Sequence, residues 1–174
     1  VIGSGPGGEG AAMKLAKSGQ SVAIVERHAQ VGGGCTHWGT IPSKALKHSI
    51  QMMVDYRRNP LFQQTVGQVK PDYPQILTAA ESVIKEQVET RYRYYARNHV
   101  DVISGHGRFV DANTLALDGS HKGEETLTAD NFVIATGSSP YRPEDVDFEH
   151  PRVHDSDSIL SLAHTPQSLT IYGA

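Results

Sequence analysis

The first eight residues, Val1-Ile2-Gly3-Ser4-Gly5-Pro6-Gly7-Gly8, place three glycines in the spacing GxGxxG directly after two apolar residues. In this pattern Gly3 allows a tight turn from strand to helix, and Gly5 lets the backbone approach a pyrophosphate. Gly8 lets the helix pack closely on the sheet. The amide end of that helix then receives the phosphates. The opening of the chain therefore predicts a βαβ unit that binds a dinucleotide.

The residues that follow strengthen this interpretation, since a lone GxGxxG is a weak signal. Small, apolar, turn, apolar and acidic residues stand where a βαβ unit needs them, at Ala12, Leu15, Gly19, Val22 and Glu26. A carboxylate at the tip of the second strand can hydrogen-bond the ribose hydroxyls of an adenosine, and it repels a 2′-phosphate. Glu26 therefore predicts the ADP half of NAD or FAD, although Arg27 beside it is able to tolerate a phosphate.

Composition and charge exclude several other classes of protein. With 174 residues, of which 38% are apolar and 20% charged, the chain fits one ordinary globular domain. A net charge of −3 gives no basic field for nucleic acid or an anionic membrane. No run is long enough to span a bilayer, and the single cysteine, Cys35, allows no internal disulfide. We expect a cytoplasmic protein with neither a nucleic-acid nor a membrane partner.

Hydrophobic periodicity predicts alternating helices and strands in the first hundred residues. The expected elements are a helix over 9–18, a strand over 21–26, a glycine-rich loop over 30–39, a helix from Pro42 or Ser43 to about Tyr56 that ends at Asn59-Pro60, and a long amphipathic helix over 73–98. This order is typical of an α/β fold of the Rossmann type, with three layers built around a parallel sheet.

Short β-like runs follow. Runs over 100–103, 107–110 and 114–117 predict a small antiparallel β-meander that 125–127 extends, and 131–135 predicts a buried strand leading into Thr136-Gly137. Prolines then mark an irregular connector. Residues 169–174 repeat the pattern of apolar residues running into glycine. We therefore expect a binding domain over 1–140 that lacks the first residues of strand 1, a connector over 141–167, and the first strand of a truncated NAD(P)-binding domain over 168–174.

Two further segments carry a family resemblance. The run Gly32-Gly33-Gly34-Cys35-Thr36-His37-Trp38-Gly39-Thr40-Ile41-Pro42-Ser43-Lys44 resembles the flavin-contacting stretch of the pyridine nucleotide-disulfide oxidoreductases, which include glutathione reductase and lipoamide dehydrogenase. Ala135-Thr136-Gly137-Ser138-Ser139-Pro140 resembles the second flavin-domain signature of that family. The resemblance covers essentially the whole chain. It implies bound FAD, with NAD(H) and NADP(H) as substrates, and a homo-oligomer formed through regions outside this segment.

The fingerprint and the resemblance together indicate the residues that bind or position the cofactor. They are Gly3, Ser4, Gly5, Gly8, Glu26, Arg27, Gly33, Gly34, Cys35, Thr36, Lys44, Gly107, Ala135, Thr136 and Gly137. Lys44 is the candidate catalytic residue, because an ammonium near the reactive flavin nitrogen stabilises the negative charge that develops on reduction. The alternative is that Lys44 is an ordinary helix residue. Cys35 is interpreted as a packing thiol.

The chain departs from the family at one informative position. Disulfide reductases of this family carry two cysteines separated by four residues, whereas here Cys35 is followed by Thr40. Thiol–disulfide exchange needs a second sulfur, so a relay from flavin to a dithiol is not available within this segment. The departure favours hydride transfer from NADPH through FAD to NAD⁺.

Two other functions stay open at the level of sequence. One is a disulfide or dihydrolipoyl-type reductase that takes its second thiol from outside the segment, and the other is a non-catalytic flavin-binding module that responds to redox state. A metal site is not predicted. His150 and His154 are four residues apart, but Pro151 weakens any helix that would align them as ligands.

Overall fold

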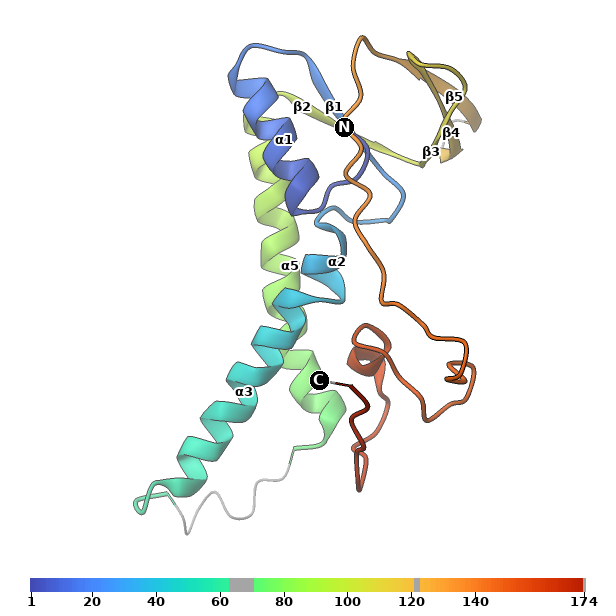
Figure 1. Ribbon diagram of the computed structural model, residues 1–174. Coiled ribbons are helices and arrows are strands. Elements are labelled where there is room, and N and C mark those ends of the chain that lie inside the picture. The colour runs from blue at the N-terminus through green and yellow to red at the C-terminus, as the bar shows by residue number, and fades with distance from the viewer. Residues whose placement is uncertain (63–70, 121–122, 174) are drawn as a thin grey trace. The chain divides into compact units, whose positions relative to one another are not determined.

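The computed structural model describes residues 1–62, 71–120 and 123–173. The chain divides into two compact units (Figure 1). The first unit consists of Val1–His37 and Ile84–Ser139, and the second consists of Trp38–Val83 and Pro140–Ala174. None of the described helices is both long enough and apolar enough to cross a membrane.

A parallel sheet forms the centre of the first unit. β1 (Val22–Glu26) pairs in parallel with β2 (Val100–Ser104), from Val22 opposite Val100 to Glu26 opposite Ser104. Ile2 bridges Val25 on one side and Ile134 on the other, both in parallel. Four of the five residues of β1 are buried, as expected for a strand covered on both faces. The predicted Rossmann-type parallel sheet is confirmed.

Helix α1 (Pro6–Lys17) connects the opening turn to β1. The prediction placed its start at Glu9, three residues too late. Pro6 is suited to the first helical position because its fixed φ matches the helix and its missing N–H is not needed there. The helix therefore begins inside the glycine fingerprint. It ends as expected before Gly19, whose φ of +84° is the left-handed conformation of a helix terminator.

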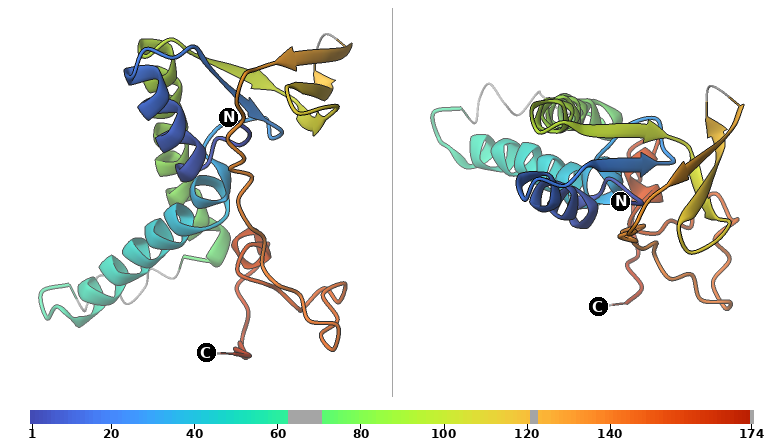
Figure 2. Two further views of the ribbon diagram at one scale, coloured as in Figure 1. Left: turned by 45° about the horizontal axis from the view of Figure 1, so that its top comes forward. Right: turned by 90° about the horizontal axis from the view of Figure 1, so that it is seen from above.

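The core of the first unit lies between this sheet and two helices. The long helix α5 (Tyr73–Arg97) matches its prediction, and its C-terminal half packs beside α1 (Figure 2). The buried core residues are Ala12, Val22, Ile24, Val31, Val88, Tyr95 and Val100. They come from both helices, both strands and the loop after β1, so burial of this cluster holds the opening turn against the sheet.

The three-stranded antiparallel meander consists of β3 (His106–Phe109), β4 (Thr114–Ser120) and β5 (Gly123–Thr128). The prediction that 100–103 forms its first strand is wrong. Those residues belong to β2, in the parallel sheet. Alternation of apolar residues does not specify a partner strand. The backbone hydrogen bonds determine the partner of β2: Gly105 N donates to the carbonyl of Glu26, so β2 stays paired with β1 to the end of that strand.

The predicted buried strand over 131–135 is also wrong in part. The segment runs parallel to the chain start, with Ile2 N donating to Val133 O and Ala135 N donating to Ile2 O. It forms an isolated bridge rather than a strand, because Ile2 is the one residue of the opening segment that bridges to it. Val133 and Ile134 are exposed rather than buried, at 36% and 66%.

The second unit contains α3 (Thr40–Arg58), the N-terminal half of α5 and the short 3₁₀ helix η1 (Ser158–Ser161). α3 begins two residues before Pro42, since the first turn of a helix tolerates proline, and it ends before Asn59 as expected. Tyr73 ties the irregular connector to α5: its hydroxyl donates to Ile159 O at 3.0 Å and its amide to Thr165 Oγ1 at 2.7 Å. Residues 168–173 form no strand in this structure.

Candidate functional site

The opening turn is built from glycines that leave no room for side chains. Gly3 has φ +99°, and a Cβ there would collide with the carbonyl oxygen of Ala135. A Cβ on Gly8 would collide with the carbonyl oxygen of Gly3. Because both positions lack a side chain, the backbone of α1 at Gly8 packs directly on the opening turn, and the backbone of Ala135 packs directly on Gly3. Both glycines are therefore required by backbone packing alone.

Gly5 and Gly33 form a second close contact between glycines, at the N-terminus of α1. Gly33 has φ +60°, and its Cβ would lie 2.7 Å from the Cα of Gly5, so the two backbones lie against each other. A Cβ on Gly7 would meet nothing within 4 Å. Gly5 is the N-cap of α1 and has no side chain to occupy the first amides of the helix. This arrangement of open amides beside bare backbone fits a pyrophosphate.

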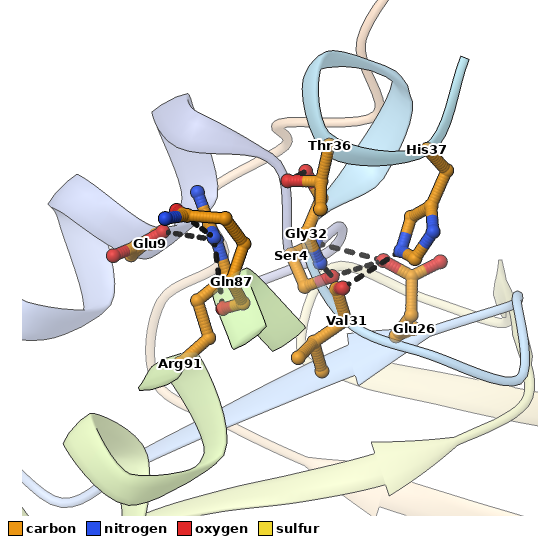
Figure 3. Close-up of polar contacts among 9 residues, drawn as sticks. All are labelled: Ser4, Glu9, Glu26, Val31, Gly32, Thr36, His37, Gln87 and Arg91. Carbon is orange, nitrogen blue, oxygen red and sulfur yellow. Dashed lines mark hydrogen bonds and ion pairs between the residues drawn. The ribbon is translucent and has the colours of Figure 1, made fainter. Parts of the chain in front are cut away.

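Glu26 is tied to the opening turn by a buried hydrogen-bond network (Figure 3). Its Oε2 accepts bonds from the amide of Ser4 at 3.0 Å and the hydroxyl of Ser4 at 2.5 Å. Its Oε1 accepts a bond from the amide of His28 at 2.9 Å. Since a carboxylate offers about four acceptor positions, the bonds from the described residues leave one position on Oε1. The network sets the carboxylate at the end of β1, where a nucleotide ribose would lie.

The same network determines the charge state of Glu26, which is 5% exposed. Burial raises the pKa of this carboxyl group, but the hydrogen bonds from the Ser4 side chain and from the amides of His28 and Ser4 outweigh it. The pKa of Glu26 is therefore held below its ordinary value of 4.5. The group therefore stays ionised at neutral pH.

The predicted glycine-rich loop over 30–39 contains a short helix, α2 (Gly33–His37), which corrects that prediction. The amide of Gly32 donates to Ser4 Oγ at 2.9 Å, and the Thr36 hydroxyl donates to Gly32 O at 2.9 Å. His37 Nε2 lies 2.9 Å from Val31 O. These contacts fold the segment back onto the opening turn, with Cys35 half-buried beside them.

The structure brings eight of the predicted residues together around the opening turn. They are joined by the contacts described above, and Thr136 is placed by its Cα, which lies 3.4 Å from a Cβ built on Gly3. The eight residues are Gly3, Ser4, Gly5, Gly8, Glu26, Gly33, Ala135 and Thr136. Gly34, Cys35 and Thr36 follow in α2. The cofactor contact of each residue stays a prediction, but their gathering in one place is observed.

The other four predicted residues are Gly107, Arg27, Gly137 and Lys44. Gly107 is in β3, where a Cβ would meet Leu115 Cδ2 at 2.7 Å, so packing explains this glycine. Arg27 is exposed and its Nε donates to His28 Nε2 at 3.2 Å. Gly137 is exposed, and Lys44 lies exposed on α3 in the second unit. Their roles toward a cofactor stay predictions.

Two residues of the network were not predicted from the sequence. Gly32 and His28 contribute backbone amides, to Ser4 Oγ and to Glu26 Oε1 respectively. Gly32 has φ +120°, and the first glycine of a triplet is a signal that could have found it. Residue type does not show which backbone amide donates a hydrogen bond, so the role of the His28 amide could not be predicted from the sequence.

Comparison with known proteins places this arrangement in a family. The family described as "Pyridine nucleotide-disulphide oxidoreductase" matches residues 1–174. Proteins named soluble pyridine nucleotide transhydrogenase from Escherichia coli O1:K1 / APEC and from Escherichia fergusonii are each 55% identical over 174 residues. The match covers 100% of this chain and 37% of each relative, so the chain spans about a third of their length.

Two solved structures are similar to this chain in fold. The HOCl-induced flavoprotein disulfide reductase RclA from Escherichia coli is 26% identical with a TM-score of 0.73, over 92% of this chain and 33% of that one. LpdA from Mycobacterium tuberculosis is 25% identical with a TM-score of 0.69, over 82% of this chain and 32% of that one. The family resemblance inferred from sequence is confirmed: the chain belongs to the pyridine nucleotide-disulphide oxidoreductase family.

Proposed function

We propose that this chain is the FAD-binding part of a cytoplasmic enzyme that transfers a hydride from NADPH through FAD to NAD⁺, in a reversible reaction. The observation that carries the proposal is a dinucleotide cradle in a chain that has one cysteine where the family's reductases have two. The cradle consists of the first amides of α1, the backbone of Gly5 and Gly33, and the carboxylate of Glu26. The 55% identity to proteins named soluble pyridine nucleotide transhydrogenase supports it. Residues 168–174 would begin an NAD(P)-binding domain, and regions beyond this chain would form a homo-oligomer.

The residues of the opening turn would hold the adenosine end of FAD. The first amides of α1 and the bare backbone of Gly5 and Gly33 would receive the pyrophosphate. The free acceptor position of Glu26 would bind a ribose hydroxyl, and its negative charge would exclude a 2′-phosphate. NADP is therefore expected to bind as a substrate elsewhere and not in this cradle.

The reaction needs little acid–base chemistry from this chain. FAD, when bound, supplies the group that accepts a hydride from one nicotinamide and gives it to another. Lys44 would stabilise negative charge near the flavin by its ammonium group. Cys35 would pack beside the cofactor as a small apolar side chain, since Thr40 offers no sulfur with which it could form a disulfide.

Replacement of Cys35 tests this proposal. In the intact protein, Cys35→Ser is expected to keep its rate of NADPH-dependent reduction of thio-NAD⁺ to within about threefold of the unmodified protein, because no step uses the thiol as a nucleophile. A thiol-dependent reductase loses its activity when an essential cysteine is removed. The measurement is the initial rate at saturating substrates, with flavin content determined for each sample.

Thr40→Ser is the matched control, since it removes one methyl group from the position where a reductase carries its second cysteine. It is expected to behave as the unmodified protein. A fall of more than about a hundredfold in Cys35→Ser, at equal flavin content, would show that the thiol takes part in turnover and would contradict the proposal.

A further inference from the structure

Glu9 stands in the first turn of α1, the helix whose N-terminus forms the cradle. Glu9 is the fourth residue of this helix, so its charge lies within about one turn of the first amides, which would receive the pyrophosphate. A negative charge at this position would repel the two negative charges of the ligand. The chain must therefore either tolerate this repulsion or neutralise it.

Arg91 on α5 meets this carboxylate (Figure 3). Its Nε lies 2.9 Å from Glu9 Oε2, and the two side chains are 11% and 22% exposed. The Nε–H is not aligned on the oxygen as in a hydrogen bond, so the contact is an ion pair. Nη1 of Arg91 donates to the carbonyl and the side-chain oxygen of Gln87, at 3.0 and 3.1 Å. Gln87 therefore holds the guanidinium in place beside Glu9.

The surroundings of the pair increase its electrostatic effect. The ion pair borders the buried core cluster, in which Tyr95 is 1% exposed. The Tyr95 hydroxyl has no hydrogen-bond partner within the described residues. Burial, followed by the charge of Glu9, raises the pKa of Tyr95. Charges that are mostly removed from solvent are only partly screened by salt, so an unpaired Glu9 would still act on the end of the helix.

We propose that Arg91 is a positioning residue for FAD, which neutralises Glu9 and so keeps the N-terminus of α1 receptive to the pyrophosphate. This inference rests on the proposed function, since it concerns the same cradle. It assigns a role to a pair of residues that are 82 positions apart, and neither of them is part of the glycine fingerprint.

A double-mutant cycle in the intact apoprotein tests the proposal, with FAD affinity measured from the quenching of flavin fluorescence. Arg91→Met removes the charge but keeps an unbranched side chain, and it is expected to weaken FAD binding about tenfold, the size of a partly buried charge at a helix end. Glu9→Gln is expected to bind FAD at least as tightly as the unmodified protein. The double variant is expected to lie within about twofold of Glu9→Gln.

Two further measurements separate charge from packing. Arg91→Lys keeps the positive charge and is expected to bind FAD within about threefold of the unmodified protein. The deficit of Arg91→Met is expected to shrink at about 0.5 M salt. Thermal unfolding of each apoprotein checks that the variants are folded, and it does not depend on the cofactor.

The outcomes are distinct. If the double variant binds FAD as weakly as Arg91→Met, Arg91 acts through packing and the inference is wrong. Unchanged affinity in Arg91→Met, or a loss in Arg91→Lys as large as in Arg91→Met, would overturn it as well. If the unmodified protein itself takes up no FAD, the proposed function fails, and this inference fails with it.

Discussion

Gly8→Ala is expected to destabilise the intact protein by about 3 kcal/mol or more and to weaken FAD binding at least a hundredfold. The Cβ that this substitution adds would collide with the carbonyl oxygen of Gly3, which is backbone and not the movable end of a side chain. Relief would require α1 to move away from the opening turn. Overpacking of this kind costs about 1–3 kcal/mol or more. A loss of about 3 kcal/mol from the free energy of binding corresponds to about a hundredfold in affinity.

The matched control is Gly10→Ala, two residues along the same helix. Gly10 is exposed, and a Cβ there would meet nothing within 4 Å. Alanine is favoured over glycine inside a helix, so this variant is expected to gain about 0.5–1 kcal/mol of stability and to keep its FAD affinity. Denaturant unfolding and flavin titration measure both variants. Equal behaviour of the two would show that close packing at Gly8 is not required.

Glu26→Gln has the second largest expected effect. The substitution keeps the size of the side chain, but an amide has one oxygen and cannot accept all three bonds from Ser4 and His28. Hydrogen bonds to a charged group contribute about 1.5–3 kcal/mol, so the loss of unfolding free energy at pH 7 is expected in that range. FAD affinity is expected to fall about a hundredfold, because the ribose loses its charged acceptor.

The effect of Glu26→Gln on stability is expected to depend on pH. The pKa of Glu26 in the folded protein lies below its ordinary value of 4.5. A lowered pKa stabilises the folded state fully above the ordinary value, and this stabilisation is lost as the pH falls through the folded pKa. The difference in unfolding free energy between the two proteins should therefore be constant near neutral pH and shrink below about pH 4.5.

Asp101→Asn is the control for this series, since Asp101 is an exposed carboxylate on β2, the neighbouring strand. It is expected to change both quantities little. A Glu26→Gln variant that kept the FAD affinity of the unmodified protein would mean that the ribose does not use this carboxylate. A stability difference that did not shrink in acid would mean that the Ser4 network does not depend on the charge.

The sequence was sufficient to predict the parts of the site whose geometry depends on residue type. Gly3 and Gly8 could be assigned because a particular backbone approach excludes any side chain, and Glu26 because its place follows from the spacing of a βαβ unit. The ends of α5 and the terminator Gly19 followed from periodicity and turn chemistry. In each case a local pattern carried enough information.

The predictions that were wrong or absent concern contacts between segments that are distant in the sequence. Apolar alternation over 100–103 did not show that β2 pairs with β1 and not with the meander. The segment over 131–135 has the composition of a buried strand, yet among the described residues it pairs only with Ile2, and Ile134 is exposed. The pairing of Arg91 with Glu9 has no local signal either, because both residues are also typical of a solvated helix surface.

Anaerobic titration of the intact, flavin-loaded protein with NADPH tests the central claim most directly. The claim is that FAD is bound by this chain and that no dithiol takes electrons from it. We expect absorbance changes to stop after about two electrons per flavin, and to be the same in Cys35→Ser. Uptake of about four electrons per flavin, reduced to about two by Cys35→Ser, would contradict the claim, and so would a protein that is purified colourless and binds no added FAD.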